Sequence, residues 1–274
     1  SGWFRTICEN GGAREALVFY DGGFANGTRV SWSYAYLWAR ANEVARALIA
    51  CGVGKGTRVG ILMTNRPEFL AATFGTALAG GVATTLSTFS TPAELDHLVA
   101  VSGISVLLME RQILKKDFAD ILIDLDPAIG TSSVGAIGST RYPFLSHVAA
   151  LGQSVGAIEE WGAFLARGKD IDQARVDARA ATNSPSDPGV LFFSSGSTAM
   201  PKGILSAHRG VTLQLWRWPK WYAAKPGEVR MWSANGFFWS GNFSMAFGGA
   251  LTRGGSLVLQ TSFNAEEALQ LMEA

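Results

Sequence analysis

The residues best suited to chemistry form one segment in which small hydroxylated residues and glycine come before a lysine: Ser194-Ser195-Gly196-Ser197-Thr198-Ala199-Met200-Pro201-Lys202-Gly203. Small residues let the backbone approach a ligand closely, so that successive N–H groups can point at phosphate oxygens. Hydroxyl groups add donors that adapt by rotation, and the lysine ammonium supplies a compact full charge. The segment therefore predicts a loop that holds a polyphosphate, with an ordinary serine- and glycine-rich surface turn as the alternative.

This segment differs from the G-x-x-x-x-G-K-S/T phosphate loop, because Gly203 follows Lys202 and the glycine spacing is different. A second glycine-rich string, residues 52–57, fits neither that motif nor G-x-G-x-x-G, since position 57 is Thr. We interpret residues 52–57 as the turn that ends a helix and enters a strand.

The elements that must position the loop are a strand on each side of it, residues 189–193 before and residues 204–206 after. Earlier in the chain, helix and strand signals alternate at short spacing. They predict a hairpin of strands 16–21 and 28–32, helix 34–51, strand 58–63, helix 67–79, strand 82–86, helix 91–101 and strand 104–109. Such alternation is typical of a parallel or mixed sheet covered by helices.

The periodicity is weaker in the middle of the chain. Residues 124–145 read as a loop-rich excursion with one short strand at 134–137, and residues 158–166 as a helix. Residues 168–188 read as an exposed connection that leads to the phosphate-loop strand. We expect further helices to start at His208 and near Asn264.

A second candidate site is an aromatic and glycine-rich segment that enters a predicted helix: Ala234-Asn235-Gly236-Phe237-Phe238-Trp239-Ser240-Gly241-Asn242-Phe243. Aromatic side chains suit an apolar slot in which a few polar groups orient a ligand. Because aromatic side chains are often buried, the alternative is that these three neighbouring rings belong to the core.

The cysteines and histidines predict neither a disulfide framework nor a metal site. Cys8 and Cys51 form no framework, and the first residues contain no cleavable apolar leader, which favours a reducing, cytoplasmic location. The three histidines are far apart in sequence and have no cysteine or carboxylate at metal-ligand spacing.

The charge pattern argues against nucleic acid and membrane partners. The 274 residues carry 23 basic and 22 acidic side chains, a formal net charge of +1. No basic run is longer than Lys115-Lys116, so no extended surface for a nucleic-acid backbone is predicted. Residues 69–93 and 231–252 contain no charge and are long enough to span a bilayer. Their glycine, threonine and asparagine content instead favours short helices and strands in a core.

The ten-residue segment resembles the phosphate loop of the adenylate-forming enzymes, the superfamily of acyl-CoA synthetases, luciferases and nonribosomal peptide adenylation domains. The family pattern is approximately Tyr/Phe-Thr-Ser-Gly-Ser/Thr-Thr-Gly-x-Pro-Lys-Gly, and the sequence matches it at Phe193, Ser195, Gly196, Ser197, Thr198, Pro201, Lys202 and Gly203. Ser194 is a mild departure. Ala199 is a sharper one, because its methyl group hinders the positive φ or close phosphate approach that glycine allows.

The resemblance covers the whole chain, through the segments 34–59, 65–68, 79–82, 161–168 and 206–210. It implies an α/β fold of layered sheets with covering helices, as in the N-terminal domain of adenylate-forming enzymes. Within that domain, it implies a first α/β subdomain over residues 1–180. A second α/β subdomain, over residues 181–274, carries the phosphate loop and is expected to be truncated.

The resemblance also implies a reaction with ATP, Mg²⁺ and CoA, in which a carboxylic acid is adenylated and then transferred to a thiol. The residues that would bind the ATP phosphates are Ser194, Ser195, Gly196, Ser197, Thr198, Lys202 and Gly203. Phe238, Trp239 and Gly241 would line a pocket for a hydrophobic, fatty acid. Trp239 stands where the family often has histidine, and Gly236 stands in place of proline. No catalytic residue is assigned within the chain.

Later motifs of the family, including an aspartate for the ribose and a lysine that assists adenylation, would follow Ala274. We therefore expect the N-terminal part of an acyl-CoA synthetase of fatty acid metabolism, without its C-terminal domain and inactive alone. Two alternatives stay open: a non-catalytic nucleotide- or acyl-binding module, and an adenylation domain of a peptide or polyketide assembly line that uses a carrier protein. A homodimer is also left open, and the sequence does not set the length of the acid.

Overall fold

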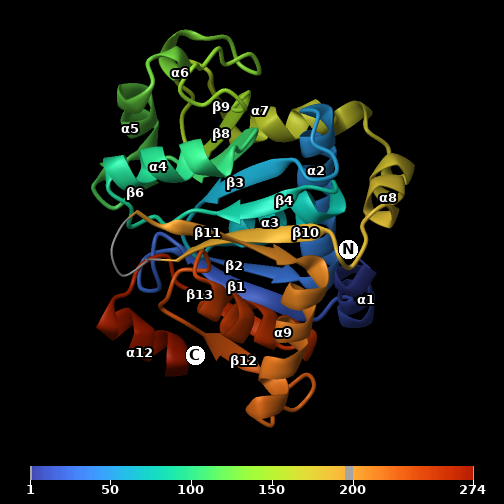
Figure 1. The fold of residues 1–274 in the computed structure, drawn as a ribbon. Helices are drawn as coiled ribbons and strands as arrows, with labels where there is room; N and C mark the ends of the chain where they lie inside the picture. The colour runs from blue at the N-terminus through green and yellow to red at the C-terminus, as the bar shows by residue number, and fades with distance from the viewer. Residues whose placement is uncertain (1, 195–199, 274) are drawn as a thin grey trace.

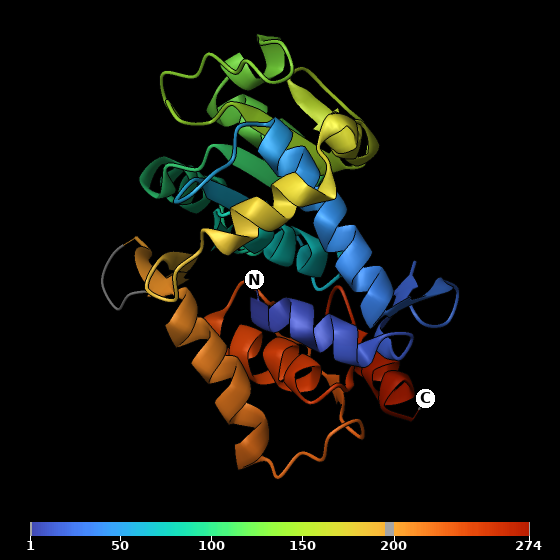
Figure 2. The same ribbon diagram turned by 90° about the vertical axis from the view of Figure 1, so that its right-hand side faces the viewer.

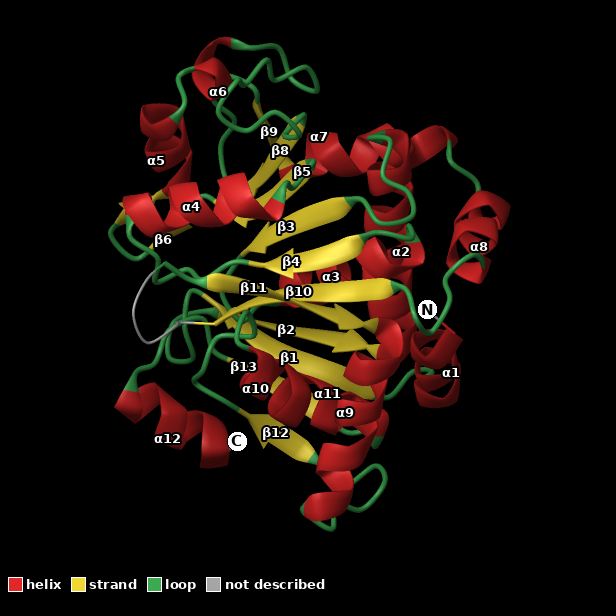
Figure 3. Ribbon diagram, in the orientation of Figure 1, coloured by secondary structure: helices red, strands yellow, loops and turns green. Residues whose placement is uncertain are grey.

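The computed structural model describes residues 2–194 and 200–273 and has an α/β fold built on two main sheets (Figures 1 and 3). The larger sheet has seven strands in the order β11-β10-β4-β3-β5-β8-β9, and every neighbouring pair is parallel except β11 with β10. Its strands are β3 (Arg58–Leu62), β4 (Val82–Thr85), β5 (Val106–Glu110), β8 (His147–Leu151), β9 (Ile158–Glu160), β10 (Pro188–Ser194) and β11 (Lys202–Ala207).

The smaller sheet has four strands in the order β12-β13-β1-β2. These are β1 (Glu15–Asp21), β2 (Thr28–Ser33), β12 (Arg230–Trp232) and β13 (Ser256–Leu259). Strand β1 pairs antiparallel with β2 as a hairpin and parallel with β13, so the two ends of the chain share one sheet. A separate two-stranded hairpin is formed by β6 (Gln112–Ile113) and β7 (Lys116–Asp117).

Two long helices connect the sheets. Helix α2 (Tyr34–Ala50) contacts β1 and β2, whereas helix α3 (Pro67–Leu78) contacts β3 and β4, and the two helices pack against each other. In Figure 2, α2 runs past α1 (Gly2–Gly11) and α8 (Gln173–Ala181) on the side turned to the viewer. The helices α4 (Pro92–Ser102) and α5 (Phe118–Leu125) contribute to a second hydrophobic cluster on the other face of the larger sheet.

The alternation of side chains along the central strands explains these two layers. In β5, Val106 and Leu108 join the cluster that contains α2 and α3, while Leu107 and Met109 join the cluster that contains α4 and α5. Successive strand residues point to opposite faces, so a strand of continuous apolar sequence needs cover on both sides. The buried run at residues 106–109 therefore requires the layered arrangement that is observed.

The remaining helices surround the sheets and connect their strands. They are α6 (Ala128–Thr131), α7 (Trp161–Ala166), the 3-10 helix η1 (Arg167–Asp170), α9 (His208–Trp221), α10 (Ser240–Asn242), the π-helical turn η2 (Phe243–Phe247), α11 (Gly248–Thr252) and α12 (Ala265–Glu273).

Most predicted elements are confirmed, and three middle segments differ. Residues 158–160 form the strand β9 instead of the start of a helix, because they complete backbone pairing along the open edge of β8. Residues 134–137 form no strand and contribute only an isolated bridge between Ser133 and Ala136. The predicted connection 168–188 contains α8, whose first turn is capped by Asp172 accepting from the Arg175 N–H.

Both sheets contain strands from either side of residue 180. The division into subdomains 1–180 and 181–274 stays a prediction. In the part of the chain that the structure describes, no helix is both long and apolar enough to cross a membrane.

Tyr34 provides a test of the link between α2 and the smaller sheet. Its side chain is fully buried, and its hydroxyl donates to the Gly255 carbonyl at 2.6 Å. Changing Tyr34→Phe leaves that carbonyl oxygen without this donor, which we expect to lower the free energy of unfolding by about 1–3 kcal/mol. Urea unfolding followed by circular dichroism measures the change.

The matched control is Tyr36→Phe on the same helix, where the side chain is 46% exposed. This change should stay within about 0.5 kcal/mol of wild type, as surface substitutions usually do. Equal losses in the two variants would contradict the role given to the Tyr34 hydroxyl.

Candidate functional site

A cavity of about 630 Å³ lies where the carboxyl ends of strands from both sheets meet. Residues that follow β3, β4 and β5 in the larger sheet form one part of its wall, and residues that follow β12 and β13 in the smaller sheet form the other. The lining residues are Thr64, Asn65, Thr88, Phe89, Ile113, Leu114, Lys115, Lys116, Ala234, Gly236, Phe238, Thr261, Ser262 and Phe263. In open α/β sheets, ligands bind in crevices outside the carboxyl ends of strands.

The elements that come after these strands lie on the same side of the molecule. The hairpin strand β6 follows β5, and helix α12 follows β13; both lie on the left-hand side of the molecule in Figure 1. The cavity is mostly apolar and has the size of an ordinary small-molecule site, roughly 300–1,000 Å³.

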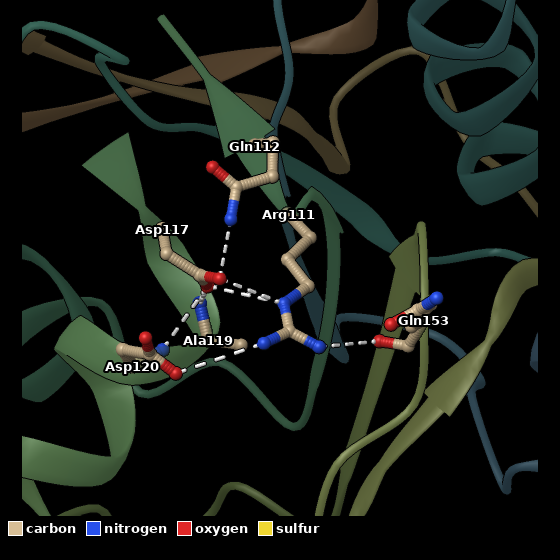
Figure 4. A network of polar contacts seen from close by, with 6 residues as sticks. All are labelled: Arg111, Gln112, Asp117, Ala119, Asp120 and Gln153. Atoms are coloured by element: carbon tan, nitrogen blue, oxygen red, sulfur yellow. Dashed lines mark hydrogen bonds and ion pairs between the residues drawn. The ribbon is translucent and has the colours of Figure 1, made fainter. Parts of the chain in front are cut away.

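The β6–β7 hairpin that carries Leu114 and Lys115 into the cavity wall is fixed at its base by Arg111 (Figure 4). The Arg111 Nε donates to Asp117 Oδ2 at 2.9 Å, and Nη1 donates to the Gln153 carbonyl at 3.0 Å. Gln112 also donates to Asp117. Since the ends of this short hairpin are held together, its turn keeps a defined position over the cavity.

Two further contacts tie this hairpin to its surroundings. Asp117 caps α5 by accepting from the Ala119 N–H at 2.9 Å. Lys116 donates to the carbonyls of Thr88 and Ser90 at 3.1 and 2.8 Å, which joins the hairpin to the loop after β4. Lys116 is thus engaged with the backbone, while its neighbour Lys115 is exposed.

The aromatic loop, residues 233–239, is held from the larger sheet by one buried amide. Asn65 follows β3 and is 3% exposed. Its Nδ2 donates to the Asn235 carbonyl at 2.7 Å, and its Oδ1 accepts from the Phe237 N–H at 2.8 Å. A single side chain therefore satisfies backbone groups on both sides of Gly236, where the loop turns toward the cavity.

Other polar groups complete this attachment. Asn242 also donates to the Asn235 carbonyl and accepts from the Ser233 hydroxyl, the second bond measuring 2.7 Å. The Thr85 hydroxyl, at the end of β4, donates to the Phe238 carbonyl at 3.0 Å. The loop that carries the predicted pocket residues is thus bonded to the ends of two neighbouring strands.

The segment around Asn65 is itself anchored by a charged group. Glu110 accepts from the Thr64 N–H and hydroxyl at 3.1 and 2.7 Å, and from Arg66 Nη1 at 3.0 Å. Burial by itself would lower the pKa of Arg66, but Glu68 and Glu110 outweigh that effect and the pKa is raised. The guanidinium stays charged and paired, which keeps the end of β3 in place.

The three neighbouring aromatic residues of the loop have different surroundings. Phe237 is 2% exposed and packs against Phe69 and Phe247, as the core alternative expects. Phe238 lines the cavity and meets Phe89 edge-on, with ring centroids 5.8 Å apart. Trp239 is 53% exposed and lines an adjoining cavity of about 470 Å³.

Gly241 lies under the Trp239 indole and is not among the lining residues of these cavities. A Cβ at position 241 would stand 3.0 Å from the indole Cη2. Gly241 therefore allows the ring to approach the backbone closely, and its predicted place in the pocket wall is indirect.

At the same edge, one strand beside the predicted phosphate loop ends and the other begins. Ser194 ends β10 and pairs with Lys202 at the start of β11, and β10 runs parallel beside β4. Ser195, Gly196, Ser197, Thr198 and Ala199 lie outside the described residues. The Pro201 carbonyl lies 3.0 Å from His97 Nε2, a contact that attaches this segment to α4.

Lys202 is exposed and forms no ion pair with the part of the chain that the structure describes. Next to it, Gly203 lies close to Leu191, since a Cβ there would be 3.1 Å from the leucine Cδ1. Gly203 thus fits between the strands, and Lys202 is available at the strand end. Over residues 2–194 and 200–273, no group of three or more His, Cys, Asp or Glu side chains could hold a metal ion.

Several residues of this cavity were not identified from the sequence: Asn65, Phe89, Lys115 and Phe263. Each follows a strand or a strand-linked hairpin, and that position is the only signal the sequence offers. Because the residues come from strands far apart in the chain, their meeting depends on the pairing of β1 with β13, which brings the smaller sheet together.

Comparison with known proteins agrees with this arrangement. The anthranilate CoA ligase AuaEII in complex with anthranoyl-AMP superposes with a TM-score of 0.80 at 20% identity, over 98% of this chain and 47% of that one. The O-succinylbenzoate coenzyme A synthetase MenE from Bacillus subtilis, in complex with ATP and magnesium ion, gives 0.70 at 18% identity, over 99% and 60%. The fold is that of the N-terminal domain of adenylate-forming enzymes.

The model of the AMP-binding enzyme family matches residues 4–274, and the chain belongs to this family. Among its relatives, a long-chain-fatty-acid–CoA ligase of Mycobacterium tuberculosis (strain CDC 1551 / Oshkosh), FadD13, is 26% identical over 184 residues, 67% of this chain and 31% of the relative. The chain spans about a third of the length of the first curated relatives that it matches. The matched part is 35% of the length of one relative and 30% of the length of another.

The role of Asn65 can be tested by Asn65→Leu, which removes the amide while keeping a side chain of similar size. The Asn235 carbonyl then loses one of its two donors, and the Phe237 N–H loses its acceptor. We expect an unfolding free energy lower by roughly 2–4 kcal/mol, from the buried groups left unpaired. Hydrogen exchange of the Phe237 amide should accelerate by more than global destabilisation explains.

The control is Asn26→Leu in the exposed loop between β1 and β2. That variant should exchange at Phe237 like wild type. An unchanged exchange rate at Phe237 in Asn65→Leu, measured by mass spectrometry with peptide-level resolution, would show that the loop does not depend on Asn65.

Proposed function

We propose that this chain forms the ATP- and acid-binding part of an ATP-dependent acid–thiol ligase that activates a hydrophobic, fatty carboxylic acid and transfers it to CoA. The observation that carries the proposal is that the strands flanking the phosphate-loop segment and the apolar cavity lie at the same edge of the larger sheet. Strand β10, which leads into the phosphate-loop segment, runs parallel beside β4, and β11 starts next to the end of β10. The loop after β4 lines a mostly apolar cavity. A polyphosphate and an apolar acid bound there would lie next to each other.

The proposed reaction has two steps. A carboxylate oxygen attacks the α-phosphorus of ATP, a new P–O bond forms, and pyrophosphate leaves with the electrons of the broken P–O bond. The thiol sulfur of CoA then attacks the acyl carbon, loses its proton and expels AMP. Both steps transfer a group between negatively charged reactants, so positioning and charge compensation supply most of the catalysis.

The phosphates would be held by Ser194, Ser195, Gly196, Ser197, Thr198, Lys202 and Gly203. The charge pattern of the surrounding chain supports this assignment, because residues 188–227 contain no aspartate or glutamate. A local excess of cationic groups attracts a polyanion and lowers the energy of its bound state. Lys202 is the cation of this stretch that starts β11 and pairs with Ser194, the last residue of β10.

The acid would lie against Phe238 and Trp239, with Gly241 supporting the indole. Phe89 and Phe263 line the same apolar wall. Burying hydrocarbon there is favourable by about 0.8 kcal/mol per methylene. A charged amino acid would gain nothing from this wall, so the surface favours a hydrophobic acid.

Mg²⁺ is part of the proposal only as the partner of the ATP phosphates, which Mg²⁺ commonly binds together with water and one or two carboxylates. The described residues present no ligand cluster of their own. Two carboxylates near the cavity wall already have partners: Glu110 is bonded to Thr64 and Arg66, and Asp117 to Arg111. We therefore assign no step to the ion.

The subdomain division 1–180 and 181–274 and a cytoplasmic location belong to the same proposal.

The phosphate role of Lys202 predicts that Lys202→Ala weakens the binding of ATP with Mg²⁺. A charge-assisted bond contributes about 1.5–3 kcal/mol, so the dissociation constant should rise roughly ten- to hundredfold. Isothermal titration calorimetry on the 274-residue chain measures this change.

The matched control is Lys225→Ala, which removes a lysine that is 75% exposed and pairs with Glu228 at 3.6 Å. Its affinity for ATP should equal that of wild type. If Lys202→Ala binds ATP as tightly as this control, the assignment of the phosphate loop is wrong.

A further inference from the structure

Two apolar cavities adjoin at the Trp239 side chain. The first has a volume of about 470 Å³ and is lined by Phe89, Ala234, Asn235, Gly236, Phe238, Trp239 and Phe263. The second has a volume of about 500 Å³ and is lined by Tyr222, Met231, Trp232, Ser233, Asn235, Trp239, Asn242, Met245 and Ala246. Among the described residues, Asn235 and Trp239 are the two that line both cavities.

The first cavity adjoins the large crevice between the sheets. The two share Phe89, Phe238 and Phe263, together with the backbone around Gly236. A hydrocarbon chain that passes from the crevice into this cavity would contact the shared phenylalanine side chains and then Trp239. Beyond the indole begins the second cavity.

Trp239 is held in this place by its own backbone. Its N–H donates to the Gly236 carbonyl at 3.2 Å, and its carbonyl accepts from the Phe243 N–H at 2.9 Å. The indole also rests against Gly241, which has no side chain to displace it. The ring is thus a wall whose position is set by the turn that leads into η2.

The second cavity is suited to hydrocarbon although it lies behind this wall. Met231 and Met245 offer unbranched, adaptable side chains, which fill irregular apolar spaces well. The polar pair in its lining, Ser233 and Asn242, is joined by a hydrogen bond of 2.7 Å. An apolar chain could enter without leaving that pair unsatisfied.

We propose that Trp239 sets the upper length of the acid by separating these two cavities. This inference rests on the proposed function, since it assumes that the acid lies along the Phe89–Phe238 wall. Each added methylene improves binding roughly fourfold while it is buried, and improves it no further once the chain reaches the indole and turns to solvent. Removing the indole joins the cavities and lets longer chains stay buried.

The test is a series of straight-chain acids, from hexanoate through octanoate, decanoate and dodecanoate to tetradecanoate, titrated calorimetrically into the 274-residue chain. In wild type, affinity should rise roughly fourfold per methylene and then level off. In Trp239→Ala, the rise should continue for several more carbons, so that the longest acids bind at least tenfold more tightly than they bind to wild type. Trp239→Phe, which keeps a smaller ring, should level off in between.

The matched control is Trp221→Ala, since Trp221 is 72% exposed and lines neither cavity. Its profile should follow wild type. Identical levelling in wild type and Trp239→Ala, with both folded by circular dichroism, overturns the inference and leaves the proposed function standing. Failure of wild type to bind any acid of the series overturns both.

Discussion

The candidate site depends on one constraint, the direction in which strands of both sheets end. In a parallel sheet every carboxyl end lies at one edge, and residues that follow neighbouring strands must meet there. The larger sheet brings together the segments after β3, β4 and β5 with the end of β10 in this way, and the pairing of β13 with β1 and β12 does the same in the smaller sheet. The cavity forms because the two edges face each other.

The facing edges of the two sheets do not by themselves fix the position of the loops that follow the strands. Asn65 supplies hydrogen bonds that hold the aromatic loop. A loop with buried backbone groups needs partners for each of them, because an unpaired buried N–H or carbonyl is costly. The Asn65 amide can donate and accept at once, so it pairs with Asn235 and Phe237 in opposite senses. A leucine or an aspartate in its place could meet only one of these needs or neither.

The sequence predicted the layered α/β fold and the segments that carry the site because their signals are local. Apolar runs identify β5 and β10, and the ten-residue order predicts a phosphate loop. The strand β9 was missed because its pairing comes from an open sheet edge supplied by β8. Asn65 lies in a segment that resembles the family, but one asparagine after a strand gives no local sign of the loop it holds, which lies 170 residues further on.

The cationic side chains near the site are of two kinds: those that are paired within the fold, and those that have no partner among the described residues. Arg66 pairs with Glu110, Arg111 with Asp117, and Lys116 with backbone carbonyls. Their charge is compensated inside the fold, so a polyanion would gain little from them without breaking these bonds. Lys202 has no such partner among the described residues, and the stretch 188–227 around it contains no acidic side chain. The charge of Lys202 is therefore left uncompensated at the start of β11, next to the end of β10 and at the edge of the larger sheet where the cavity opens, and there it can attract a polyanion.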